Sequence, residues 1–219
     1  MSLILKDEKP VREPHPAGVH DAVCYCIADI GTHHEQTPWG AKDTRQVVVA
    51  WELPKLRIEI EKDGKKLDLP RAYSQTYTLN FGSLAKIRQH LELWRGTEFT
   101  KEELQGFDIK AVLGACCQLQ LVHKTSETTG KKSARIATII PWEAGRKKIK
   151  AENEHQWFSL DEGNDIPANI PKWIREKIEN SQEWVAMGQA AGISNADEPT
   201  KEVDEVPWPD EEEVDNMPF

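Results

Sequence analysis

The sequence predicts a mainly β domain that is interrupted by a helix and followed by a C-terminal helix and an acidic tail. Three observations predict this class. Apolar residues recur in short alternating or continuous stretches rich in β-branched and aromatic side chains, and helical spacing is confined to a few places. Turn residues separate many of these stretches. The final segment, residues 194–219, combines dense negative charge with few residues that could be buried.

The first elements are a polar arm and two strands. Residues 1–17 are mostly polar and contain three prolines, which predicts an N-terminal arm. Residues 20–31 are apolar on both sides, which suits a long buried strand. Residues 32–44 predict a polar loop. In the second strand, residues 45–53, Trp51 is in phase with Val47 and Val49, so core packing is the favoured interpretation of this ring.

A hairpin, a third main strand and a helix follow. Residues 56–69 alternate, turn at Asp-Gly and alternate again, which predicts an inserted hairpin. Residues 73–80 predict a strand with Tyr73 and Tyr77 on one side. A helix is predicted from Ser83 to Gly96, because four apolar residues recur at helical spacing: Leu84, Ile87, Leu91 and Trp94.

The rest of the domain is predicted as a short helix, two strands and a final helix. Thr100 and Glu103 form a capping-box pattern at the start of the short helix. Residues 115–124 and 133–141 predict a long hairpin with a basic tip. A C-terminal helix is expected at about residues 171–187, because a proline suits its first turn and apolar residues form one stripe.

This order of elements is that of the OB fold, in which a helix lies between the third and fourth of five barrel strands. The predicted fold is therefore an OB-fold-like five-stranded barrel over residues 18–145, with an inserted hairpin. A C-terminal extension, residues 146–193, and the acidic tail, expected to be disordered, follow it. An OB barrel binds single strands between two loops, which correspond here to residues 32–44 and 125–133.

The residues of these loops and of the third strand are the candidate nucleic-acid contacts. Aromatic rings stack on bases of any identity and cations follow phosphates, so sequence-independent binding is expected. For Trp39, which lies between Pro38 and Gly40 in a polar loop, a ligand contact is favoured over core packing. For Tyr73 and Tyr77 both interpretations stay open, because either strand face could be the outer one. The full set is Trp39, Lys42, Arg45, Tyr73, Tyr77, Lys124, Lys131, Lys132 and Arg135.

The net charge of −9 does not exclude nucleic-acid binding, because the charge is unevenly distributed. Residues 197–219 hold ten acids and one base, and without them the chain has 27 acids and 27 bases. Residues 41–150 carry 21 bases and 13 acids. A basic centre with an acidic tail fits a protein whose tail competes with a polyanion for the binding surface.

The tail ends in an apolar tip beside a free carboxylate, and this tip resembles the C-terminus of bacterial and phage single-stranded DNA-binding proteins. In those proteins an acidic stretch that ends in a hydrophobic residue, proline and phenylalanine docks replication and repair enzymes. The resemblance implies a partner-binding set of Asp210, Glu211, Glu212, Glu213, Asp215, Met217, Pro218 and Phe219. The alternative is a tail that only increases solubility.

The resemblance extends from about Gly18 to Val185. The segments that carry it include Tyr77-Thr78-Leu79-Asn80 before a helix, Gly106-Phe107-Asp108, Leu113-Gly114-Ala115-Cys116-Cys117 and Ser181-Gln182-Glu183-Trp184. Together they resemble a family of phage-encoded single-stranded DNA-binding or replication accessory proteins. That resemblance implies partners in DNA replication, recombination or repair. The inserted hairpin and the final helix depart from the usual bacterial protein, so an assembly of two copies is expected rather than one of four.

The sequence favours this function over a metal-binding protein or an enzyme. Cysteines 24, 26, 116 and 117 with His33 and His34 could bind zinc, but they form no Cys-x-x-Cys pair and are read as reduced thiols. Asp29, Glu35, Asp43 and Glu52 could hold magnesium in a nuclease. The sequence has no phosphate-binding glycine loop or nucleophile elbow. A non-enzymatic protein without cofactor or metal is expected, and a protein adaptor or DNA mimic that acts through the tail stays the alternative.

The expected location is the cytoplasm of a bacterial host. Charged residues follow the first five residues at once, so no signal peptide is predicted. No apolar stretch approaches the length of a membrane span.

Overall fold

The computed structural model describes residues 13–37, 40–62, 64–127 and 129–190. These residues form a mainly β protein, as predicted. Five antiparallel strands lie in the order β3-β2-β1-β4-β5, and β6 pairs with β1 in parallel. The strands are β1 Gly18–Thr37, β2 Gly40–Lys62, β3 Lys65–Thr78, β4 Cys116–Thr125, β5 Lys132–Pro141 and β6 Gln156–Phe158.

Strand β1 lies at the centre of the sheet. Its first residues pair with β4, and from Val23 onward it pairs with β2. Cys24 and Ile27 contribute to one hydrophobic cluster, whereas Tyr25 and Ala28 contribute to a second cluster on the opposite face. Burial on both faces accounts for the continuous apolar composition of this strand, so the predicted buried first strand is confirmed.

The prediction of a polar loop over residues 32–44 is wrong for the residues that the structure describes, because 32–37 and 40–44 form the paired ends of β1 and β2, a two-stranded arm. Strands β1 and β2 stay paired as far as Thr37 and Gly40. The arm is held by polar contacts between the two strands, such as the 2.8 Å bond between His34 Nδ1 and the Asp43 carboxylate. The polar composition of this segment favoured a loop. Strands that lie outside the core can still pair through their backbones without an apolar face, so polarity did not exclude strands here.

The inserted hairpin is present, but it continues β2 and β3 and forms no separate pair of strands. Its register is irregular between Leu53 and Arg57, where β2 has extra residues. Beyond this point the pairing is regular up to the turn between Lys62 and Lys65. Arg57 holds the base of the hairpin, because its guanidinium donates to the carboxylates of Asp68 at 3.0 Å and Glu152 at 2.5 Å.

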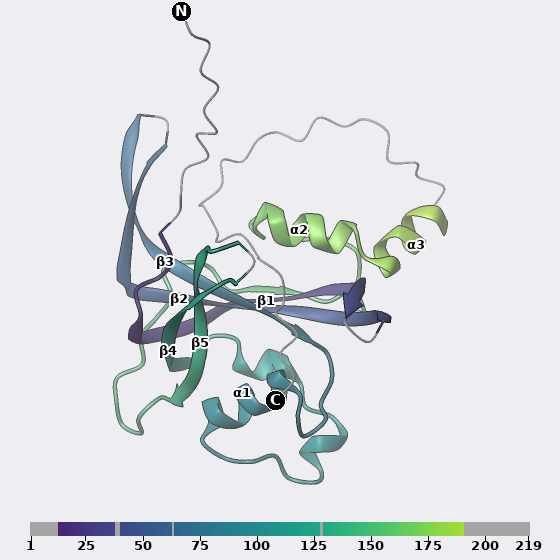
Figure 1. Cartoon of the computed structure of the whole chain (residues 1–219), viewed down its shortest axis with the longest axis horizontal. Coiled ribbons are helices and arrows are strands. Elements are labelled where there is room, and N and C mark those ends of the chain that lie inside the picture. The colour runs from purple at the N-terminus through teal and green to yellow at the C-terminus, as the bar shows by residue number, and fades with distance from the viewer. Residues whose placement is uncertain (1–12, 38–39, 63, 128, 191–219) are drawn as a thin grey trace, which may run out of the picture.

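Helix α1, Lys86–Arg95, covers one side of the sheet (Figure 1). It starts three residues later than predicted and ends at Gly96, whose φ of 70° gives the expected left-handed cap. Two 3₁₀ helices follow, η1 Glu103–Gln105 and η2 Ile109–Val112. The capping box is confirmed, since Thr100 N donates to the Glu103 carboxylate at 2.9 Å. It starts only a 3₁₀ turn, because Gly106 follows at once.

The C-terminal extension covers the other side of β1 and β2 (Figure 1). One helix was predicted at about residues 171–187, but there are two, α2 Lys172–Glu179 and α3 Gln182–Ala190. The chain turns at Ser181, whose buried hydroxyl accepts from Trp184 N at 3.2 Å and so caps α3. In the described part of the chain, no helix is long and apolar enough to span a membrane.

Two carboxylates fix the extension to the sheet. Glu52 is fully buried on β2 and accepts hydrogen bonds from Glu152 N at 2.8 Å and Asn153 N at 2.9 Å. Glu183 at the start of α3 accepts from Thr32 N at 2.7 Å and from its hydroxyl at 2.5 Å. A buried charge such as that of Glu52 needs such compensation, and the bonds of both carboxylates specify where the extension docks.

The close approach of α3 to β1 gives a first prediction. Gly31 has a φ of +75°, and a Cβ there would lie 2.4 Å from Ser181 Cβ. Gly145 has a similar φ of +80° but no atom within 4 Å of an added Cβ. Gly31→Ala is therefore expected to lower the free energy of unfolding by about 2 kcal/mol more than Gly145→Ala, because only the first clashes. Urea unfolding measures both, and equal losses would contradict the docking.

Candidate nucleic-acid interface

Three cations from distant parts of the chain come together beside the β4–β5 hairpin. Lys124 lies on β4. Arg135 lies on β5 and pairs with Val122, which is two residues before Lys124 on β4. Lys86 is the first residue of α1, a helix that packs against β5. Burial lowers the pKa of Lys86, and the charges of Arg135 and Lys124 lower it further. The fold thus holds three like charges near one another. This arrangement favours an anionic ligand.

Two more predicted contacts lie at the exposed tip of this hairpin. Lys131 ends the loop and Lys132 begins β5. The loop is closed by hydrogen bonds from Ser126 N to Lys131 O at 2.9 Å and from Gly130 N to Ser126 O at 2.9 Å. The predicted loop at residues 125–133 is present but shorter, because β4 ends at Thr125 and β5 begins at Lys132. Lys124 and Arg135 lie on one strand face, whereas Lys132, which pairs with Thr125, lies on the other. Lys86 joins Lys124 and Arg135 only in the folded chain.

The arm of β1 and β2, predicted as the other nucleic-acid clamp, is different in character. Arg45 is bound to Asp29 at 2.5 Å and to Asp161 at 2.9 Å, and the bond to Asp29 is the main cause of its raised pKa. Lys42 is exposed but lies opposite Glu35. Trp39 lies outside the described residues. In the part of the arm that the structure describes, cations are accompanied by acids, which weakens the attraction of this surface for a polyanion.

Tyr73 and Tyr77 are core residues, which excludes them as base-stacking contacts in this fold. Their exposed fractions are 5% and 4%. The Tyr73 hydroxyl donates to Ala134 O at 3.3 Å, and burial raises the pKa of Tyr73 to about 12. Pairing with β2 aligns both rings with Trp51 and Val47, on the inner face of the sheet. The alternation placed the two tyrosines on one face but did not show which face was inner.

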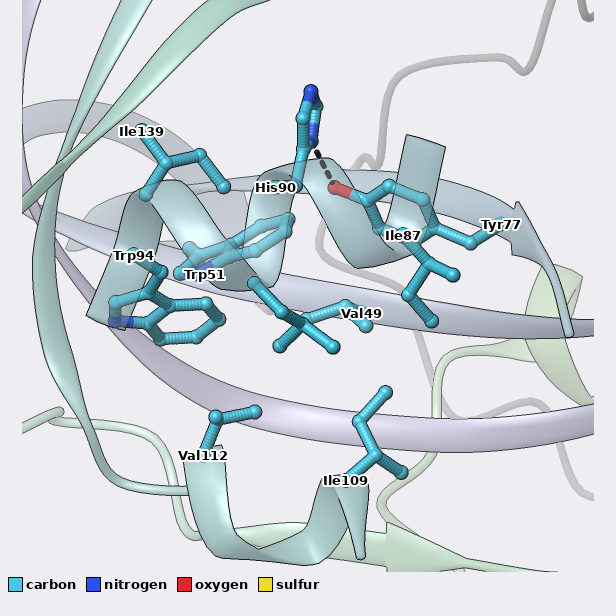
Figure 2. A pocket seen from close by; sticks show the side chains of 10 residues that line it. Val49, Trp51, Tyr77, Ile87, His90, Trp94, Ile109, Val112 and Ile139 are labelled. Carbon is cyan, nitrogen blue, oxygen red and sulfur yellow. Dashed lines mark hydrogen bonds between the residues drawn. The ribbon is translucent and has the colours of Figure 1, made fainter. Parts of the chain in front are cut away.

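The core around Tyr77 is closely packed (Figure 2). Its hydroxyl lies 2.7 Å from His90 Nδ1. Burial, together with the smaller effect of the Lys86 charge, lowers the pKa of His90 to about 4. Trp51 lies 5.6 Å from Trp94, as expected for a core ring. The cavity between α1 and the sheet measures only about 10 Å³, which is enough for about one water molecule. It is therefore a packing gap without room for an organic ligand.

The assignment of Tyr77 to the core gives a second prediction. Tyr77→Phe removes the partner of the buried His90 ring and should lower the free energy of unfolding by about 1 to 2 kcal/mol. Affinity for oligo(dT) should stay within about twofold of the unchanged protein, because the ring does not reach the surface. Unfolding in urea and fluorescence titration measure the two quantities. A large loss of affinity at unchanged stability would restore Tyr77 as a DNA contact.

The residues considered for metal binding are separated or occupied. Within the described segments, no three histidine, cysteine, aspartate or glutamate side chains lie close enough together to hold a metal ion. All four cysteines are free and buried. Of the acids considered for magnesium, Asp29 binds Arg45, Glu35 accepts from Thr44, Asp43 binds His34 and Glu52 holds the extension.

No protein-family model matches the chain, and no curated protein matches it either. The proposed partner-binding residues of the tail, from Asp210 to Phe219, lie outside the described residues. Function is therefore inferred from the sequence and from the geometry of the described residues.

Proposed function

We propose that this protein binds single-stranded DNA without sequence preference, on an OB-type barrel. The strand order supports this proposal, because β1 pairs with both β2 and β4 and α1 lies between β3 and β4 in the chain. The Tyr73 hydroxyl links β3 to β5, the two strands that face each other across the opening of the sheet. The inserted hairpin and the C-terminal extension are additions to this barrel.

The single observation that carries the proposal is the cation cluster of Lys86, Lys124 and Arg135. Bringing like charges together and partly burying one of them is unfavourable in the free protein. A polyanion offsets that repulsion and releases its own counterions on binding. Lys131 and Lys132 extend the same charge to the hairpin tip. A surface of this kind follows a phosphate backbone and reads no sequence.

We propose that the role is binding and not catalysis, with no cofactor. The acidic tail then recruits proteins of DNA replication, recombination or repair in a bacterial host cytoplasm, through the tip that ends in Phe219. An assembly of two copies fits the barrel with its additions better than one of four. An adaptor or DNA mimic that acts through the tail alone is the second candidate, favoured by the ten acids of residues 197–219.

The deciding experiment is a titration of the protein with oligo(dT) and with a matching duplex, followed by tryptophan fluorescence at two salt concentrations. The chain has eight tryptophans, so a bound strand has several possible reporters. Quenching by the single strand that weakens as salt rises is the expected result. If the folded protein responds to neither nucleic acid, the barrel does not bind DNA and the adaptor is the better explanation.

Removal of residues 197–219 is expected to tighten oligo(dT) binding several-fold at 50 mM salt. The removed segment carries ten acids and one base, so it competes with the phosphates for the cation cluster. The gain should shrink above roughly 0.2 M salt, where screening weakens both interactions. A variant in which the same acids become asparagine or glutamine serves as control, since it keeps chain length. Affinity that is unchanged or weaker in both variants would contradict the competition.

A further inference from the structure

One face of the sheet carries no helix among the described residues, and the extension touches it only at its edge, where Arg146 binds Asp21. It is the outer side of the first part of β1 with β4 and β5, here called the open face. The extension stops at its border, where Cys116 Sγ contacts Ile149 O at 3.3 Å. Register aligns its residues in rows across the three strands. The open face consists of Val19, Asp21, Gln118, Gln120, Val122, Lys124, Ser133, Arg135, Thr138 and Ile140.

The open face is apolar and amide-rich, and its only acid is neutralised. Val19 is 51% exposed and Val122 is 40% exposed. Asp21 is the one carboxylate among these strand residues, and its side chain accepts from Lys55 at 2.6 Å, Arg146 at 2.8 Å and Gln118 at 2.8 Å. Burial by itself would raise the pKa of Asp21, but these bonds hold it below its ordinary value. The face therefore presents no unpaired negative charge to a ligand.

An aromatic ring lies at the end of the open face opposite the hairpin tip. Trp142 follows β5 directly and is partly exposed. The Arg146 guanidinium lies 4.0 Å from the ring centre, and Trp142 Nε1 donates to Arg146 O at 3.2 Å. Arg146 also binds Asp21, so the ring is tied to β1. Exposed lysines follow at positions 147, 148 and 150, and Glu143 is the one acid between Trp142 and Lys150.

We infer that single-stranded DNA lies along the open face, with phosphates on the hairpin cations and a base stacked on Trp142. This inference rests on the proposed function and adds the path and the stacking residue. From Lys124 to Gln118, β4 rises about 20 Å at about 3.4 Å per residue, so several nucleotides fit along it. Bases then cover Val19 and Val122, while cations at both ends hold the phosphates. The extension excludes the alternative path over residues 25–30 of β1.

The test compares four single variants in oligo(dT) titrations at several salt concentrations. Val122→Glu places a charge at the centre of the open face and should weaken binding at least 10-fold. The matched control is Val185→Glu on α3, because Val185 is 45% exposed but distant in the fold; its affinity should be unchanged. Trp142→Ala should weaken binding about 10-fold without changing the salt dependence, because stacking involves no counterions. Thermal unfolding checks that each variant is folded.

The outcomes separate the path from the proposed function. If Val122→Glu and Trp142→Ala bind like the unchanged protein, while loss of the hairpin cations weakens binding, the path is wrong and the function stands. If Val185→Glu weakens binding as much as Val122→Glu, the loss is not specific to the open face and the path is also overturned. A protein that binds no single strand at all overturns both. Trp142→Phe should retain most of the affinity, since a phenyl ring still stacks.

Discussion

Reversal of two charges, Lys124→Glu with Arg135→Glu, is expected to weaken oligo(dT) binding about 100-fold at 50 mM salt. Two attractive contacts with phosphates become repulsive, and Lys86 then lies beside two carboxylates and no longer beside two cations. The logarithmic salt dependence should fall by about 1.4, because each phosphate contact to a single strand contributes about 0.7. Fluorescence titration at four or more salt concentrations measures both quantities.

The matched control reverses Lys101 and Lys172, which are exposed and lie before η1 and at the start of α2. This control changes the net charge by the same amount, so it accounts for the general electrostatic effect. Its affinity should fall only a few-fold. Equal losses in the two double variants would show that binding depends on total charge, and the hairpin cluster would no longer be the site.

Acidification from pH 7 to pH 5 is expected to lower the free energy of unfolding by about 4 kcal/mol. Burial lowers the pKa of His15 and of His90 to about 4 each, from an ordinary 6.5. Between these values the unfolded chain binds more protons, so stability falls as pH drops below 6.5. At pH 5 each histidine contributes about 2 kcal/mol of that loss. Urea unfolding at the two pH values measures it.

The carboxylates do not obscure this window. Hydrogen bonds hold the pKa values of Asp21 and Glu183 below their ordinary 3.8 and 4.5, so their contributions are lost only at lower pH. His90→Asn retains a hydrogen-bonding group for Tyr77 but cannot gain a proton, and it should halve the pH dependence. A variant that keeps the full dependence would show that His90 is not one of the responsible groups.

Several features of the fold followed from local sequence. Alternation and β-branched residues predicted the strands, Gly96 predicted the end of α1, and Thr100 with Glu103 predicted a capping box. These predictions succeeded because each depends on residues a few positions apart. The arm of β1 and β2 and the break at Ser181 were missed. The arm is held by pairing between its own two strands, which its polar composition did not reveal. The position of α3 depends on distant contacts, such as the bonds of Glu183 to Thr32, 151 residues away in sequence.

The same division applies to the candidate site. By itself the sequence determined the mainly β class, the basic hairpin tip with Lys131 and Lys132, and the separation of a basic centre from an acidic tail, since composition and short spacing are local properties. Only the tertiary structure decided that Tyr73 and Tyr77 face inward, that Arg45 is neutralised by Asp29, and that Lys86 joins the hairpin cations. Those outcomes depend on strand pairing and on packing between distant segments, because a period of two defines two faces without saying which one the core covers.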